Sequence, residues 1–158
     1  MARTLQARRN DETAAATSDA PAFRREEALG YNLRRAQVSV FQKFLTMFED
    51  LQLRPVEYST LTLIQDNPGR KQTEISHALG ISRANFVPLI DGLEARGLVE
   101  RRPSAEDRRA NALFLTSAGI KFVDAVHQRH EFLEREFTLR LGGPAKRAEF
   151  QAMLRLLS

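Results

Sequence analysis

Hydrophobic positions recur at alternating steps of three and four residues in the first third of the chain. The positions in this series are Leu29, Leu33, Ala36, Val40, Phe44, Met47 and Leu51. That spacing places the side chains on one face of an α-helix. Phe41, Leu45 and Phe48 widen the same face. We therefore predict a long amphipathic helix over residues 29–51 that packs against two surfaces rather than one.

A second helix is predicted in the segment RPVEYSTLTLIQDNPG. Pro55 stands near its start, where a missing backbone N–H is tolerated, and Pro68 with Gly69 follows its end. Together with the long helix before it, this segment precedes the most informative part of the chain, residues 70–115.

Two closely spaced helices are predicted within residues 70–97. In the segment GRKQTEISHALG, Ile75 and Leu79 form an apolar face, and Gly80 supplies the positive φ that ends a helix. Ser82 is a good N-cap for the next helix. The apolar face of that second helix comprises Phe86, Leu89, Ile90 and Leu93. A short turn containing glycine between two helices is typical of a helix-turn-helix motif.

A hairpin is predicted to follow. The segments LVERR and ANALFL are short and partly apolar, and they flank PSAEDRR, whose proline, serine and aspartate favour a loop. The arginines at the tip of this hairpin are suited to entering a minor groove.

In a helix-turn-helix motif, the N-terminal residues of the second helix meet base edges in the major groove. We therefore expect Ser82, Arg83 and Asn85 to face DNA. Gln72 and Thr73, at the start of the preceding helix, are candidates for phosphate contact, although an ordinary helix start explains them equally well. Arg101 is a further candidate, for which a phosphate contact and a solvated strand face are both open.

The motifs LGISRANFVPLIDGLEARGLVERR and DRRANALFLTSAG resemble the MarR (multiple antibiotic resistance regulator) family of bacterial winged-helix repressors. The resemblance implies that Asp107 supports the wing loop and that Arg109 reaches into a minor groove, with Arg108 beside it. One departure is Pro88, because this family often has an arginine there. A base contact from that position is then lost, and readout shifts to Arg83 and Asn85.

The resemblance also implies a small-molecule effector, often an aromatic or phenolic acid or a related anionic metabolite. We expect it to be an aromatic acid or its thioester, held between the dimer helices and the DNA-reading module. The candidate lining is Tyr31, Arg34, Arg35, Phe44 and Tyr58. Rings there are suited to stacking and an arginine to pairing with a carboxylate. Ordinary core and surface roles remain open for each of these residues.

Beyond the hairpin, Thr116 is placed to cap a long helix with a heptad-like seam, followed by a Gly142-Gly143-Pro144 break and a last amphipathic helix. The seam comprises Val123, Val126, His130, Leu133 and Phe137. Helices at both ends of a central module suggest a homodimer, whose two reading helices would favour a palindromic site.

Composition changes this picture little. The 158 residues include 24 basic and 20 acidic side chains, a balance that permits a polyanionic partner without requiring one. The absence of cysteine excludes a thiol switch and, with no signal-like or membrane-spanning run, predicts a cytoplasmic protein without membrane partners. No constellation typical of an enzyme is present. His127 and His130 lie at i, i+3 spacing near acidic residues, but a packing role for His130 is favoured over zinc.

The sequence thus predicts a mainly α-helical winged helix-turn-helix protein with a small β-hairpin wing and N- and C-terminal dimerisation helices. Residues 1–22 are expected to form a disordered arm, residues 23–51 and 116–158 the dimerisation helices, and residues 52–115 the DNA-binding module. The predicted function is a homodimeric, ligand-responsive regulator of transcription, a repressor that binds double-stranded DNA and has no cofactor or metal. The alternative is a winged-helix module that binds protein and not DNA.

Overall fold

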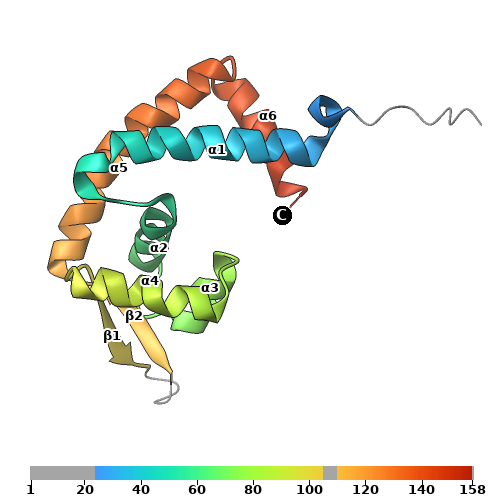
Figure 1. Ribbon diagram of the computed structural model, residues 1–158. Helices are drawn as coiled ribbons and strands as arrows, with labels where there is room; N and C mark the ends of the chain where they lie inside the picture. Colours follow the sequence, from blue (N-terminus) through green and yellow to red (C-terminus); the bar gives the residue numbers. More distant parts are fainter. Residues whose placement is uncertain (1–23, 105–109, 158) are drawn as a thin grey trace, which may run out of the picture. The chain divides into compact units, whose positions relative to one another are not determined.

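The computed structural model describes residues 24–104 and 110–157, which form six α-helices and a two-stranded antiparallel sheet (Figure 1). The elements in chain order are α1 Leu29–Met47, α2 Pro55–Asp66, α3 Gln72–Ala78, α4 Arg83–Ala95, β1 Val99–Pro103, β2 Asn111–Leu115, α5 Ser117–Arg140 and α6 Pro144–Arg155, with 3-10 turns at Arg25–Glu27 and Glu49–Leu51. The predicted class, mainly helical with a small hairpin wing, is confirmed. The predicted N-terminal arm lies outside the described residues.

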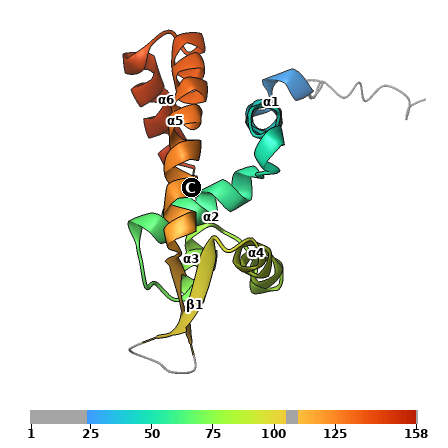
Figure 2. The ribbon, with the colours of Figure 1, turned by 90° about the vertical axis from the view of Figure 1, so that its left-hand side faces the viewer.

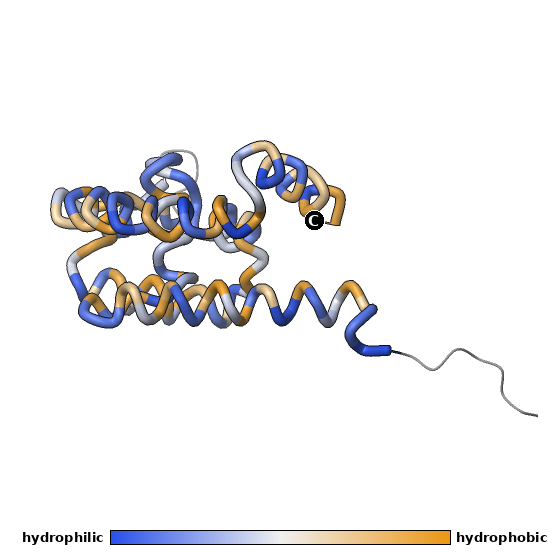
Figure 3. Tube along the Cα trace, turned by 90° about the horizontal axis from the view of Figure 1, so that it is seen from above, coloured by the Kyte–Doolittle hydropathy of each residue, from blue (hydrophilic) through white to orange (hydrophobic). Residues whose placement is uncertain are grey.

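The chain divides by its internal contacts into two compact units, Met1–Ala36 and Gln37–Ser158, so the boundary falls within α1. The second unit contains the end of α1 and every later element. Hydrophobic and hydrophilic residues alternate along α1, the long helix that follows the grey N-terminal trace in Figure 3, as the three-and-four spacing predicts.

The first helix ends earlier than predicted, at Met47 rather than Leu51. The chain turns there through Glu49–Leu51, and Gln52 takes a left-handed conformation with φ of 48°. The turn buries Phe48 and Leu53, which are 0% and 1% exposed, so burial of both side chains overrides continuation of the helix. Helical periodicity alone could not reveal this, because Leu51 also fits the heptad step.

The core of the second unit is built from side chains of α1, α2, α3, α4, the sheet and α5. Val123, Val126 and Leu133 of the predicted α5 seam are among its buried members. That part of the seam therefore packs inside the protomer and is not free to form a dimer interface, which corrects the interpretation of these positions. Thr116 caps α5 as predicted, because its hydroxyl accepts a hydrogen bond of 2.9 Å from the Gly119 N–H.

An ion pair joins the turn after α1 to α5. Both guanidinium ends of Arg129 donate to the Asp50 carboxylate, at 2.9 and 3.0 Å, and Arg129 also lies over the Phe48 ring. The hydrogen bond from Arg129 lowers the pKa of Asp50 below its ordinary 3.8. A lowered carboxyl pKa stabilises the fold above that ordinary value, and the contribution disappears as the pH falls through the folded-state pKa.

We therefore expect Asp50→Asn to be less stable than wild type near neutral pH, with the difference shrinking in acid. Urea unfolding followed by circular dichroism between about pH 6 and pH 2 would measure this. A difference in unfolding free energy that stays constant across this range would contradict the assignment. The effect is expected to be small, because both side chains are substantially exposed.

The wing is a two-stranded hairpin (Figure 2), and the segment before α3 supports the outer edge of β2. β1 and β2 pair antiparallel with Val99 opposite Leu115 and Arg101 opposite Leu113. On the other edge of β2, the Gly69 N–H donates to the Leu113 carbonyl at 2.9 Å, and the Leu113 N–H donates to the Arg70 carbonyl. Gly69 has φ of 83°, and a Cβ there would lie 3.0 Å from the Phe114 ring. The segment before α3 therefore fixes the base of the wing.

Candidate nucleic-acid interface

The turn between α3 and α4 has the local structure that the sequence predicts. Gly80 takes a φ of 64°, which ends the first helix at little steric cost. The Ile81 N–H then donates to the Ser76 carbonyl at 2.9 Å, which closes the turn. Ser82 occupies the N-cap position of α4 in extended backbone, although its side chain makes no capping hydrogen bond.

The predicted base-reading residues lie together at the start of α4. Ser82, Arg83 and Asn85 are all exposed. The opposite face of the helix is buried in the core through Phe86, Leu89, Ile90 and Leu93. This division orients α4 so that its polar N-terminal end is presented to solvent. The helix continues as one element through Pro88, which is itself exposed.

Of the two candidate phosphate ligands at the start of α3, only one has a side chain that is exposed without a bond to Arg101. Thr73 is exposed, but the Gln72 side chain accepts a hydrogen bond from the Arg101 Nε at 3.2 Å. Lys71 occupies the N-cap position, and its backbone N–H donates to the Glu74 carboxylate at 3.3 Å. Gln72 is therefore engaged within the protein, whereas Thr73 presents its side chain to solvent.

Arg101 is also engaged within the protein. Its guanidinium bonds to Asp91 and Glu94 on α4, each at 2.6 Å, and its side chain is only 19% exposed. Both interpretations left open by the sequence, a phosphate contact and a solvated strand face, assumed an Arg101 side chain that points into solvent, whereas here it is paired with two carboxylates. A depression of about 340 Å³ lies beside it, between α3, α4 and the wing. Arg83, Arg101, Gln72 and Thr73 are among its lining residues.

The predicted wing-tip residues Asp107, Arg108 and Arg109 lie outside the described residues. Their roles in wing support and minor-groove contact stay predictions from the family resemblance. Arg102, nearest to that loop among the basic strand residues, pairs with Glu100 and lies over the Phe114 ring at 4.5 Å.

Two of the candidate effector residues meet in an aromatic cluster. The rings of Phe44 and Tyr58 lie 5.7 Å apart, and His130 lies 4.8 Å from Tyr58 and 6.0 Å from Phe44. The Tyr58 hydroxyl is 3.1 Å from the His127 Nδ1. Burial raises the pKa of Tyr58, with a smaller contribution from Glu134, and burial lowers the pKa of His130. Burial thus favours the uncharged form of both side chains.

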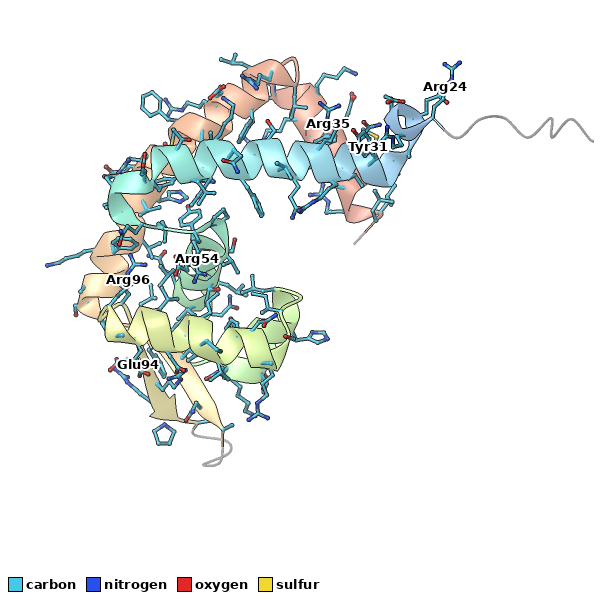
Figure 4. All side chains as sticks on the ribbon, viewed as in Figure 1. Arg24, Tyr31, Arg35, Arg54, Glu94 and Arg96 are labelled. Carbon is cyan, nitrogen blue, oxygen red and sulfur yellow. The ribbon has the colours of Figure 1, made fainter. Side chains whose placement is uncertain are left out.

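The other effector candidates belong to the first compact unit. Tyr31 and Arg35 are both exposed on α1, and the Arg35 guanidinium lies 5.8 Å from the Tyr31 ring centre (Figure 4). Arg34 is exposed on the same part of the helix. A shared lining with Phe44 and Tyr58 stays a prediction.

Several charged residues that join the elements of this unit were not predicted from the sequence. Glu57 is buried at the start of α2, where its carboxylate meets Arg54 at 2.9 Å and Arg96 at 3.8 Å; Figure 4 labels both arginines. Arg96 is the C-cap residue of α4 and also donates to the Leu51 carbonyl. Asp91 and Glu94, the partners of Arg101, were likewise missed. Their only sequence signal is a three-residue spacing on a helix, which surface acids commonly share.

His130 has the packing role that the sequence favoured, because its ring packs edge-on against Phe44 and at a tilt against Tyr58. Among the described residues, no group of three or more histidine, aspartate or glutamate side chains is arranged to hold a metal ion. No helix within residues 24–104 and 110–157 has both the length and the apolar character needed to cross a bilayer.

A short helix, a glycine turn, a second helix with an exposed polar start and an adjoining hairpin define a winged helix-turn-helix protein. Residues 51–110 match the family model described as MarR family. The protein assigned as the transcriptional regulator for the hcr operon of Thauera aromatica is 30% identical over 130 residues, which cover 82% of this chain and 78% of that protein. The chain belongs to the MarR family of winged helix-turn-helix transcriptional regulators, a family of DNA-binding proteins and not of enzymes.

Two solved structures of the transcriptional repressor CouR are also similar. CouR bound to a 23-mer DNA duplex has a TM-score of 0.78 and 40% sequence identity, over 84% of this chain and 93% of CouR. CouR bound to p-coumaroyl-CoA has the same TM-score and 38% identity, over 88% of this chain and 97% of CouR.

Proposed function

We propose that this protein is a homodimeric transcriptional repressor that binds a palindromic operator and is released from it by an aromatic acid or its coenzyme A thioester. Residues 52–115 form the DNA-binding module in this proposal, and the helices within 23–51 and 116–158 form the dimer. The observation that carries the proposal is the exposed N-terminal end of α4, where Ser82, Arg83 and Asn85 are presented together.

The chemistry of these side chains suits base recognition. An arginine pairs bidentately with guanine and an asparagine with adenine, and each such pair is worth about 1–3 kcal/mol of discrimination. The buried face of α4 holds the helix in place, so its start is ordered before DNA arrives. CouR, which is 40% identical to this chain, binds a DNA duplex, and this supports the same role here.

Exposed apolar side chains near both ends of the second unit support the dimer. They include Val38, Val40, Phe41 and Leu45 on α1 and Met153, Leu154, Leu156 and Leu157 at the C-terminus. Exposed apolar side chains repeated along one helix mark an interaction surface on a monomer. A two-fold dimer would place two copies of α4 about 34–36 Å apart and would favour a palindromic site.

The effector assignment is supported by the aromatic cluster and by the CouR complex. Phe44, Tyr58 and His130, on α1, α2 and α5, bring three rings together. Phe44 and Tyr58 are buried in the core, so a planar aromatic ligand stacks on these rings only in a state of the protein that opens this part of the core. CouR binds p-coumaroyl-CoA, an aromatic thioester. A ligand of this class releases DNA only if its affinity is higher for the state of the dimer that cannot bind DNA than for the state that can. Moving from almost fully bound to almost fully released requires about 5.5 kcal/mol of differential affinity.

The test is selection of bound duplexes from a random pool by the full chain, repeated with p-coumaroyl-CoA present. Free p-coumaric acid is tested as the second candidate effector, and coenzyme A alone is the matched control, because it lacks the aromatic acyl group. We expect an enriched palindrome with half-sites about one helical turn apart, and loss of enrichment with the thioester. Light scattering is expected to give the mass of two chains.

The outcomes separate the parts of the proposal. No enriched duplex would favour a module that binds protein instead of DNA. An enriched palindrome that persists with all three compounds would overturn the effector class and leave DNA binding intact. An enriched single half-site bound by a monomer would overturn the dimer.

A further inference from the structure

Arg101 on β1 contacts all three parts of the winged helix. Its Nη2 bonds to Asp91 and its Nη1 to Glu94 of α4, each at 2.6 Å, and its Nε donates to Gln72 of α3 at 3.2 Å. Its backbone N–H also donates to Glu94 at 3.3 Å. Figure 4 labels Glu94 on the part of α4 that lies next to β1. We call Arg101, Asp91, Glu94 and Gln72 the Arg101 cluster.

The cluster leaves Arg101 little capacity for a phosphate. A guanidinium has five N–H donors, and here all three of its nitrogens are engaged, with Nη2 also 3.5 Å from the Val87 carbonyl. Two carboxylates against one guanidinium give the cluster a net negative charge. A residue in this environment is poorly suited to attract DNA directly.

The geometry nevertheless links Arg101 to DNA binding. β1 cannot tilt away from α4 without breaking two charge-assisted hydrogen bonds, and it cannot shift along α3 without losing the bond to Gln72. We propose that Arg101 is a positioning residue, which fixes the angle between the wing and the recognition helix α4 so that both engage one DNA site together. This inference rests on the proposed function, because it assumes that α4 and the wing bind DNA.

Removing the carboxylates gives a test in which the direction of the change in DNA affinity distinguishes positioning from simple charge attraction. Asp91→Asn and Glu94→Gln each remove a negative charge, so simple attraction to a polyanion predicts tighter DNA binding. Loss of positioning predicts weaker binding, by about tenfold for either variant. Glu100→Gln is the matched control, because it removes the same charge from β1 but breaks only the pair with Arg102. This control is expected to bind as tightly as wild type or more tightly.

Arg101→Lys separates positioning from a phosphate contact. Lysine keeps the positive charge but loses the forked geometry that reaches two carboxylates and an amide at once. We expect about tenfold weaker binding, as for the carboxylate variants. A direct phosphate contact would tolerate the lysine with little change.

Affinities are measured by fluorescence anisotropy on a duplex selected by the wild-type chain. Amide hydrogen exchange is measured for residues 99–102 without DNA. The expected result is weaker binding and faster exchange in that segment for Asp91→Asn, Glu94→Gln and Arg101→Lys, but not for Glu100→Gln. Carboxylate variants that bind as tightly as the control would overturn the inference. Unchanged hydrogen exchange in all variants would also overturn the inference, and this readout does not depend on DNA. Failure of the wild-type chain to bind any duplex would instead overturn the proposed function.

Discussion

Replacing Arg83 and Asn85 together by alanine is expected to remove most of the preference of this protein for its operator. Both side chains are exposed at the start of α4, whose opposite face is fixed in the core. Each bidentate contact to a base contributes about 1–3 kcal/mol of discrimination, so the double variant should lose about 2–6 kcal/mol of selectivity. Binding to arbitrary duplexes should persist, because phosphate contacts supply it.

The measurement is the dissociation constant for a scrambled duplex divided by the dissociation constant for a selected duplex of equal length, at fixed salt. Asn85→Ala alone is expected to lower the ratio without changing the charge of the protein. Arg135→Ala removes a positive charge from an exposed position on α5 and serves as the control, for which the ratio should stay at the wild-type value. If the double variant kept the wild-type ratio, α4 would not be the element that distinguishes sequences.

Local signals explain why the helix-turn-helix was predictable from sequence. The end of the first helix depends on Gly80 taking a positive φ, and the start of α4 depends on Ser82 remaining extended at the N-cap. Pro55 at the start of α2 and Thr116 before α5 act in the same way. Each signal involves residues within one turn of one another, so it requires no knowledge of the tertiary structure.

Helical periodicity was less informative, because it shows that a face is apolar but not what covers it. The α5 seam has the spacing of a dimer interface, yet Val123, Val126 and Leu133 are buried by other elements of the same chain. The end of α1 was misplaced for a related reason. Leu51 continues the pattern, but burial of Phe48 and Leu53 requires a turn whose benefit is visible only in three dimensions.

The Arg101 cluster shows the same limit for the candidate site. In sequence, Arg101 is one of several arginines in a basic hairpin, which favours a contact with phosphate. Its partners lie 7, 10 and 29 residues away, so the sequence contains no local sign that they meet. Sequence patterns therefore predicted the position of the reading surface but not the network that holds the wing against it.

A single methyl group at Gly119 is expected to cause the largest loss of stability among simple substitutions at the junction between wing and α5. A Cβ at this position would lie 2.0 Å from the Leu98 carbonyl oxygen, and the same oxygen accepts the Thr116 N–H at 3.1 Å. The obstacle is backbone, so it cannot rotate away as a side chain would. Gly119→Ala should therefore destabilise the fold by about 3 kcal/mol, at the upper end of the usual cost of overpacking.

Gly92→Ala is the matched control, because it makes the same change inside another helix where nothing lies within 4 Å of the new Cβ. Alanine should stabilise that helix by about 0.5–1 kcal/mol. Urea unfolding is then expected to show a lower free energy of unfolding for Gly119→Ala and a higher one for Gly92→Ala. Helix propensity alone would raise the free energy of unfolding in both variants. Equal stabilisation by the two alanines would show that α5 does not abut the Leu98 backbone, and that the base of the wing is held by other contacts.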